Sequence, residues 1–168
     1  MKLRSAVNFA LPDYLLGFLA LGFIAIPANA ATATSSFAVS ATVVSTCLVS
    51  ATSLGFGSYT GLVAPASSTV SVTCTNTTPY VVGLSAGLGT GATVTTRKMT
   101  GPASALLDYG LFQDAGHTVG WGVTAGTDTV AGTGNGATQP ITAYGQMAAG
   151  QSGNPAVYSD TITATITY

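Results

Sequence analysis

The chain has 168 residues and a formal net charge of −1; only 5% of its residues are charged, whereas 47% are hydrophobic. This length fits one domain with a sizeable core. So few cations leave no basic surface for nucleic-acid phosphates or for an anionic membrane, which excludes both as partners.

The first 30 residues predict a secretory signal peptide rather than part of the fold. Lys2 and Arg4 precede an apolar run at 15–26, and residues 28–30 have the small side chains of a cleavage site. The run is too short for a stable membrane span. Cleavage after Ala30 leaves a mature chain with two basic and four acidic side chains.

The stretch that follows alternates apolar and polar residues, which predicts a β-strand. Phe37, Val39, Ala41 and Val43 share one face of it, because side chains alternate with period two along a strand. Residues 31–46 include no glycine, proline, asparagine or aspartate, so nothing there favours a turn. We therefore expect this strand to pair with another molecule.

Two other interpretations of residues 37–43 stay open at this point. They could form the ordinary first strand of a complete sandwich. They could also insert into their own domain, although residues 44–46 span only about 10 Å when extended and offer no turn.

Cys47 and Cys74 are the only cysteines. In an exported chain, an even pair indicates a disulfide formed in an oxidising compartment. Closing this loop stabilises the fold by roughly 3–4 kcal/mol in the chain-entropy model. A four-ligand zinc site needs more cysteine or histidine than the chain offers, so we expect neither metal nor cofactor.

The rest of the chain shows no helical period and predicts short strands between turn residues. Residues 87–91 predict a flexible hairpin, and residues 132–136 predict a long mobile loop. The expected strands are 47–49, 54–59, one through Val70, Val72 and Cys74, then 80–85, 94–99, 106–113, 120–123, 141–147 and 157–168.

Two of these strands have clear faces. The strand at 106–113 places Leu107, Tyr109, Leu111 and Gln113 on one side. The last strand places threonines on one side and an apolar set on the other, as in a half-buried antiparallel strand. That apolar set is Ile162, Ala164, Ile166 and Tyr168. The elements together predict an all-β sandwich of immunoglobulin-like type.

The polar residues do not form a recognisable catalytic site. His117 is the only histidine; a triad with Asp114 or Asp128 lacks the strand–serine–helix elbow, so we expect an exposed turn histidine. The carboxylates are scattered singly, without a glycosidase-type pair. We expect Asp160 to accept hydrogen bonds at a turn and Arg97 to pair with one of the aspartates.

The glycine-rich tract 87–91 lacks the ending of a phosphate-binding loop and no helix follows it. The aromatic residues Tyr109, Phe112, Trp121 and Tyr144 could stack on a sugar, but core packing is the favoured role. We predict that the protein is not an enzyme.

Several segments, taken in this order, resemble a known family. They are residues 45–47, 54–59, 72–74, 97–99, 107–114, 121–122 and the alternating run 158–168. Their combination resembles the spore coat protein U domain, whose family includes the Csu-type pilus subunits of archaic chaperone–usher systems.

The resemblance implies an incomplete immunoglobulin-like sandwich that lacks its last strand. It implies a donor strand before the first cysteine, matching residues 35–45, which is exchanged between subunits. The acceptor groove would be bordered by Ile162, Ala164, Ile166 and Tyr168, and the family disulfide maps onto Cys47 and Cys74. The implied partners are identical or related subunits, a periplasmic chaperone and an outer-membrane usher.

The sequence thus predicts a signal peptide at 1–30, a donor-strand extension at 31–46 and a pilin-like domain at 47–168. The predicted function is that of a structural pilus subunit, exported through the periplasm to the cell surface for attachment and biofilm formation. Alternative functions are a surface- or carbohydrate-binding tip module and a cell- or spore-coat protein without a pilus.

Overall fold

The computed structural model describes residues 29–168. In that range the chain forms one short 3-10 turn, η1 (Pro102–Ser104), and eight strands. The strands are β1 (Cys47–Ala51), β2 (Ala64–Cys74), β3 (Pro79–Leu84), β4 (Arg97–Thr100), β5 (Leu106–Phe112), β6 (Val130–Thr133), β7 (Thr138–Met147) and β8 (Ala164–Thr167). The predicted signal peptide lies outside the described residues except for Asn29 and Ala30, and the described part contains no helix long and apolar enough to cross a membrane.

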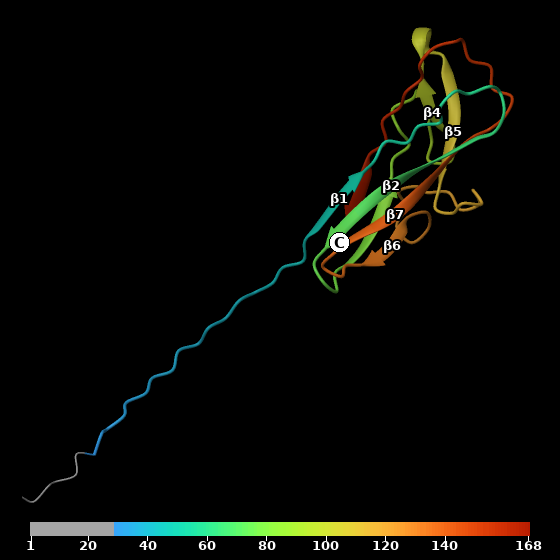
Figure 1. Ribbon diagram of the computed structural model, residues 1–168. Coiled ribbons are helices and arrows are strands. Elements are labelled where there is room, and N and C mark those ends of the chain that lie inside the picture. Colours follow the sequence, from blue (N-terminus) through green and yellow to red (C-terminus); the bar gives the residue numbers. More distant parts are fainter. Residues whose placement is uncertain (1–28) are drawn as a thin grey trace, which may run out of the picture. The chain divides into compact units, whose positions relative to one another are not determined.

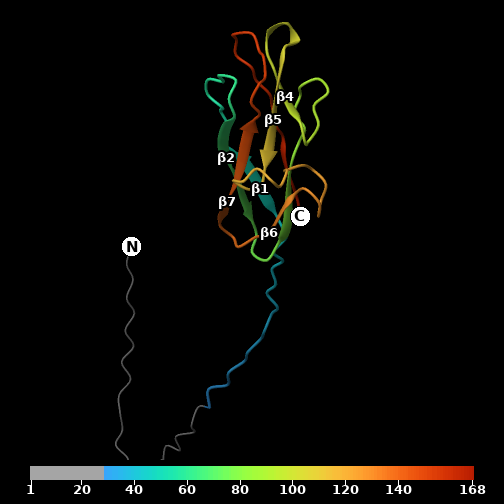
Figure 2. The same ribbon diagram turned by 90° about the vertical axis from the view of Figure 1, so that its right-hand side faces the viewer.

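The strands form two antiparallel sheets, which confirms the predicted all-β sandwich (Figure 1). One sheet has the order β1-β2-β7-β5-β4 and the other has the order β6-β3-β8. The connections after β1, β3, β4 and β7 gather at one end of the domain, and the β2–β3 and β6–β7 turns lie at the other end (Figure 2).

The core lies between the sheets and follows the predicted alternation. In β2 the residues Val70, Val72 and Cys74 are buried, and the residues between them are less so. Trp121 enters the core from the connection between β5 and β6, is fully buried and donates its indole N–H to the carbonyl oxygen of Val82 at 2.8 Å. The other buried apolar residues are Tyr80, Val82, Leu84, Leu107, Tyr109, Leu111, Ala143 and Met147.

Two of the expected strands do not form. Residues 54–59 belong to no strand, because the Thr52 hydroxyl accepts the Thr69 N–H at 3.0 Å and ends the β1–β2 ladder. Residues 120–123 form only an isolated bridge at Gly120. Their main chain instead joins β3, since the Gly122 carbonyl accepts the Leu84 N–H at 2.8 Å.

Other boundaries shift by one to several residues, and two of these shifts have a clear physical cause. The expected loop at 132–136 begins inside β6, where Gly132 pairs with Tyr80; a Cβ on Gly132 would lie 2.5 Å from that ring, so only glycine permits the approach. The last strand is limited to β8, because the Thr163 N–H is bonded to the Ser85 hydroxyl at 2.9 Å rather than to a carbonyl.

Candidate functional site

The sandwich is open along one side, between β1 and β8. Within residues 29–168, β1 pairs only with β2 and β8 pairs only with β3. The two strands are neighbours from different sheets (Figure 1) and share no ladder. Edges of this kind present unpaired N–H and C=O groups and are templates for another strand.

The side chains of β8 and the residues before it alternate as expected. Ile162, Ala164 and Ile166 are half-buried and pack against the core, whereas the threonines between them are exposed. Tyr168 lies beyond the end of β8 and is 57% exposed.

The main chain of β8 presents hydrogen-bonding groups to the open side. The Ser85 N–H donates to the Thr163 carbonyl at 3.0 Å, so the main-chain groups of Thr163 point toward β3. Successive residues of an antiparallel strand point to opposite sides in the plane of the sheet. The N–H and C=O groups of Ala164 and Ile166 therefore point away from β3, toward the open edge.

A cavity of about 430 Å³ lies between these two edges. Both sheets contribute apolar side chains to it, so part of the hydrophobic core faces the opening. Its lining includes Val70, Leu84, Leu111, Ala143, Ile162 and Ala164. This is the geometry of a sandwich from which one strand is missing, and we call the opening the groove.

A second cavity, of about 880 Å³, extends the groove toward the connections after β1 and β7. It is formed by residues 54–61 and 151–158 together with core side chains such as Met147. The two cavities have four lining residues in common, Leu54, Phe56, Met99 and Tyr158.

Asp160 fixes the chain just before β8, as expected for a hydrogen-bond acceptor at a turn. Its Oδ1 accepts the N–H groups of Leu88 at 2.7 Å and Thr161 at 2.8 Å, and its Oδ2 accepts the Tyr109 hydroxyl at 2.7 Å. Burial, reinforced by this bond to the carboxylate, raises the pKa of Tyr109 above its usual range. Tyr109 and Asp160 both line the first cavity, so their bond holds part of its wall.

Replacing Tyr109 with phenylalanine should lower the free energy of unfolding by about 1.5–3 kcal/mol, the usual contribution of a hydrogen bond to a charged group. Because folding raises the pKa of Tyr109, the contribution is complete below about pH 10, where unfolded tyrosine titrates, and declines above it. Urea unfolding at pH 7 and pH 10.5 measures both effects. Tyr144→Phe is the control, since the Tyr144 hydroxyl has no hydrogen-bond partner among residues 29–168; an equal loss in both variants would contradict the assignment.

Arg97 does not pair with an aspartate, so that expectation was wrong. The ion pair in the described chain is made by the neighbouring Lys98, whose Nζ lies 2.7 Å from Asp108 Oδ1. Arg97 is fully buried, and burial lowers its pKa. Its guanidinium donates at 2.6–2.9 Å to four main-chain carbonyls, those of Leu84, Ser85, Val94 and Trp121.

Cys47 and Cys74 form a disulfide across the first pair of the β1–β2 register, with their Cα atoms 4.1 Å apart. The bond anchors the start of β1 to its neighbour. Residues 44–46 therefore connect the alternating segment 37–43 to a fixed point at the edge of the sandwich.

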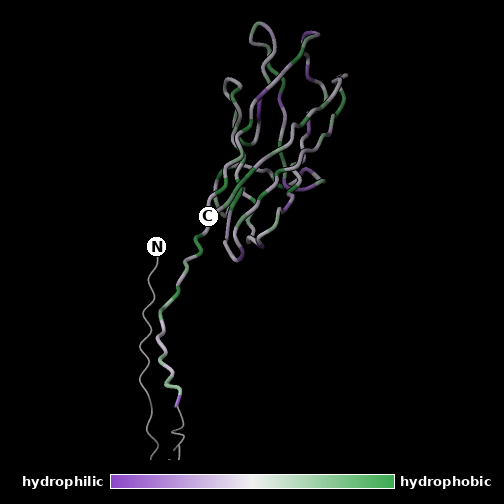
Figure 3. The backbone as a smooth tube through the Cα atoms, turned by 60° about the vertical axis from the view of Figure 1, so that its left-hand side comes forward, coloured by the Kyte–Doolittle hydropathy of each residue, from purple (hydrophilic) through white to green (hydrophobic). Residues whose placement is uncertain are grey.

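The alternating segment pairs with no strand among residues 29–168. Residues 29–46 belong to no helix or strand, and hydrophobic positions recur along them (Figure 3). Phe37, Val39 and Val43 are 86%, 84% and 88% exposed. In the described chain the first strand of the sandwich is β1, and residues 37–43 belong to no strand.

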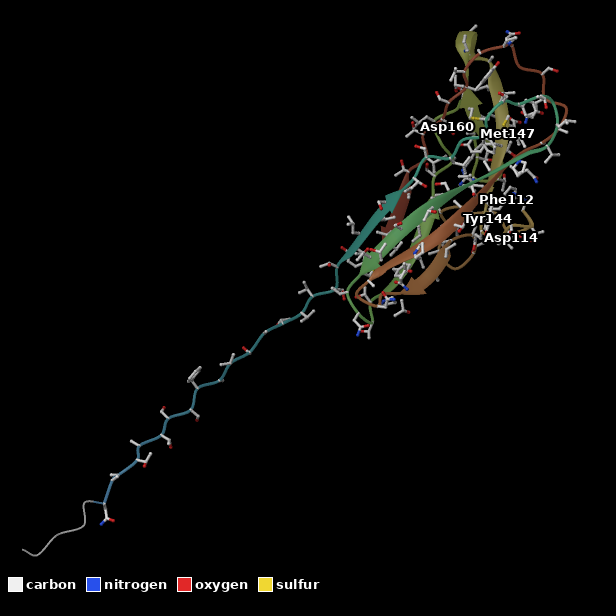
Figure 4. All side chains as sticks on the ribbon, viewed as in Figure 1. Phe112, Asp114, Tyr144, Met147 and Asp160 are labelled. Atoms are coloured by element: carbon white, nitrogen blue, oxygen red, sulfur yellow. A yellow bond between two sulfur atoms is a disulfide. The ribbon has the colours of Figure 1, made fainter. Side chains whose placement is uncertain are left out.

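The expected exposed histidine is half-buried. Its ring packs edge-on against Phe112, with centroids 5.3 Å apart, and against Tyr144 at 6.5 Å. Asp114 instead binds its own loop; the hydrogen bond from the Val119 N–H, supported by Thr118, lowers its pKa. Phe112, Asp114 and Tyr144 lie together, away from Asp160 (Figure 4). The side chains of His117 and Asp114 thus contact other groups, and the two residues meet through their main chains, where the His117 N–H donates to the Asp114 carbonyl at 3.1 Å.

The aromatic residues divide between core and surface. Trp121 and Tyr109 are buried, as expected, whereas Phe112 and Tyr144 are half-buried outside the core cluster. Among the described residues, no group of three histidine, cysteine or acidic side chains is placed to hold a metal ion.

Sequence reasoning missed two contributions to the groove. Leu84 and Ala143 lie within expected strands and Leu111 lies on one face of the strand at 106–113, but nothing local marks any of them as facing an opening. Leu54 and Phe56 read as part of a strand; the signal against a strand was the glycine at every second position, 55 and 57.

Comparisons with known proteins agree with this architecture. Residues 33–165 match the Spore Coat Protein U domain. Protein U of Myxococcus xanthus is 34% identical over 129 residues, covering 69% of this chain and 72% of that protein. A chain of the crystal structure of the CsuC–CsuE chaperone–tip adhesion subunit pre-assembly complex, from the archaic chaperone–usher Csu pili of Acinetobacter baumannii, has a TM-score of 0.56 and 21% sequence identity.

The last similarity covers 76% of this chain and 41% of the Csu-complex chain, and at this identity it shows a shared fold. The sequence match is what identifies the family, since it includes both the alternating segment and nearly all of the sandwich. The chain belongs to the Spore Coat Protein U domain family.

Proposed function

We propose that this protein is an exported structural subunit of a chaperone–usher pilus and that it polymerises by donor-strand exchange. Residues 37–43 of one copy occupy the groove of another copy, beside β8. The observation that carries the proposal is the groove itself, where core side chains and an unpaired strand edge face an opening. The same chain supplies an alternating segment that pairs with no strand in the described part of the chain.

The apolar contribution to this association is large. Phe37, Val39 and Val43 are almost fully exposed in the single chain. Burying each side chain contributes roughly 1.5–3 kcal/mol. Main-chain hydrogen bonds to the open edge of β8 add to this, as in other cases of β-strand addition. Dissociation of a completed pair is therefore slow.

The connection to β1 favours exchange between copies over self-insertion. Residues 44–46 reach only about 10 Å, and the disulfide holds Cys47 at the start of β1. A strand lying in its own groove beside β1 would have to reverse direction within this spacer. A second copy needs no reversal, because its donor enters the groove from outside.

Chaperone and usher partners follow from the same geometry. An open edge beside exposed core is an aggregation hazard until a strand covers it. A periplasmic chaperone would cover the groove before an outer-membrane usher exchanges it for the donor strand of an identical or related subunit. The shared fold with a chain of a chaperone–subunit pre-assembly complex supports this order. We propose the cell surface as the destination, with roles in attachment and biofilm formation.

The test uses the mature chain, residues 31–168. Polymers should run as a ladder on a denaturing gel without boiling and collapse to monomer on boiling, and electron microscopy should show filaments. Deleting residues 35–45 removes no strand of the sandwich and should abolish both. A ladder that persists after the deletion would rule out the donor role.

A further inference from the structure

Residues 52–59, here called the strap, cross the groove with both ends tied. At the first end, Thr52 donates its N–H to the Thr69 carbonyl at 2.9 Å and accepts the Thr69 N–H at its hydroxyl. At the second end, the Tyr59 hydroxyl donates to the Ala148 carbonyl at 2.6 Å and accepts the Gln151 N–H at 3.1 Å. These hydrogen bonds hold both ends of the strap against the sandwich.

The middle of the strap is held by two side chains. Residues 53–58 make no main-chain hydrogen bond to other described residues. Leu54 and Phe56 are half-buried against the core, and the Phe56 ring meets that of Tyr109 edge-on at 5.7 Å. A Cβ on Gly145 of β7 would lie 2.9 Å from Leu54 and 3.1 Å from Phe56, so the glycine leaves room for both. The packing of Leu54 and Phe56 against Gly145 and Tyr109 therefore holds the middle of the strap in the groove.

That position lies where the two cavities meet. Leu54 and Phe56 line both cavities, and so do Met99 and Tyr158. A strand that extends from the first cavity into the second therefore passes these four side chains.

The donor face has a matching order of side-chain sizes. Phe37 and Val39 are followed by Ala41, its only small member, and then by Val43. Residues two apart on a strand are separated by about 6.6–6.8 Å. The pattern therefore places one small side chain between two larger ones, so Ala41 is the donor residue that needs the least room.

We infer that the strap forms a constriction that admits only a small donor side chain, and that Ala41 of a second copy is the residue that passes it. This inference rests on the proposed function. Phe37 and Val39 fill the cavity on one side of the constriction, and Val43 fills the cavity on the other. The Leu54–Phe56 pair thereby selects the register, and hence the identity, of the donor strand.

Replacing Ala41 with leucine tests the constriction in the full mature chain. Over-packing a fitted site typically slows or weakens association by roughly tenfold or more, so the polymerisation rate should fall by about that factor. Ala38→Leu is the matched control, because it makes the same change on the opposite face of the segment; its rate should stay near that of the wild type. Equal rates for the wild type and Ala41→Leu would overturn the inference.

Enlarging the constriction should rescue the larger donor residue. Combining Ala41→Leu with Leu54→Ala should restore most of the lost rate, and Phe56→Leu is a milder second partner if Leu54→Ala fails to fold by circular dichroism. Loss of rate in Ala41→Leu without rescue by either folded partner would also overturn the constriction. A wild-type chain that forms no polymer would contradict the proposed function instead, which keeps the two failures apart.

Discussion

Replacing Val39 with aspartate should abolish polymer formation and leave the folded domain as stable as the wild type. Val39 is 84% exposed in the single chain, so the substitution removes no packing there. In the groove, the carboxylate would lose water without gaining a partner, at a cost of several kcal/mol, and the burial of valine would be lost as well. Each 1.4 kcal/mol is a factor of ten, so the association constant should fall by about a thousandfold or more.

Ser40→Asp is the control for Val39→Asp. It adds the same charge one residue away, on the face that points out of the groove, and should polymerise at close to the wild-type rate. Ladder intensity without boiling measures polymerisation, and urea unfolding of the monomer checks the domain. If both variants polymerise as well as the wild type, neither face of the segment is buried in the groove, which contradicts the donor role; if only Ser40→Asp fails, the opposite face enters the groove.

The sequence best predicted the strands that bury only one of their two faces. In β2, β5 and β8 the burial repeats every second residue, because a sheet with a single core face imposes that period. The disulfide also followed from the sequence, through cysteine count and export. These patterns are local, so they can be recognised in the sequence without knowing which strands are neighbours.

The rest depended on distant contacts. Gly132 was expected in a loop and Gly145 within a strand, with no special role for either. In the structure, Gly132 leaves room for the side chain of Tyr80 and Gly145 leaves room for that of Leu54. The strap looked like a strand because Leu54 and Phe56 alternate, but the Thr52 hydroxyl ends its ladder. No local pattern could show that Arg97 would bind carbonyls rather than an aspartate. The alternation along β8 could be predicted from the sequence, whereas the position of the strap could not.

Replacing Arg97 with methionine should cause the largest loss of stability of any single change considered. Methionine has an apolar side chain of similar length to the arginine stem. It lacks the guanidinium N–H groups that donate to four main-chain carbonyls. A buried polar group without a partner costs about 1–3 kcal/mol. Even with partial relaxation we expect a loss of about 4 kcal/mol or more, close to the whole stability of many domains. The carbonyls of Leu84 and Ser85 end β3, so the wall formed by β8 should fray first.

Lys98→Met is the matched control for Arg97→Met, since it removes a cation from the next residue of the same strand. Lys98 pairs with the more exposed Asp108, and a surface ion pair of this kind contributes at most about 1 kcal/mol. Arg97→Lys should remain strongly destabilised, because a single ammonium cannot reach four carbonyls that surround a planar guanidinium. Urea unfolding gives the three free energies, and hydrogen exchange at Thr165 and Thr167 reports fraying of β8. Equal losses for Arg97→Met and Lys98→Met would show that Arg97 stabilises the fold only through its charge, and would remove its role in holding the groove.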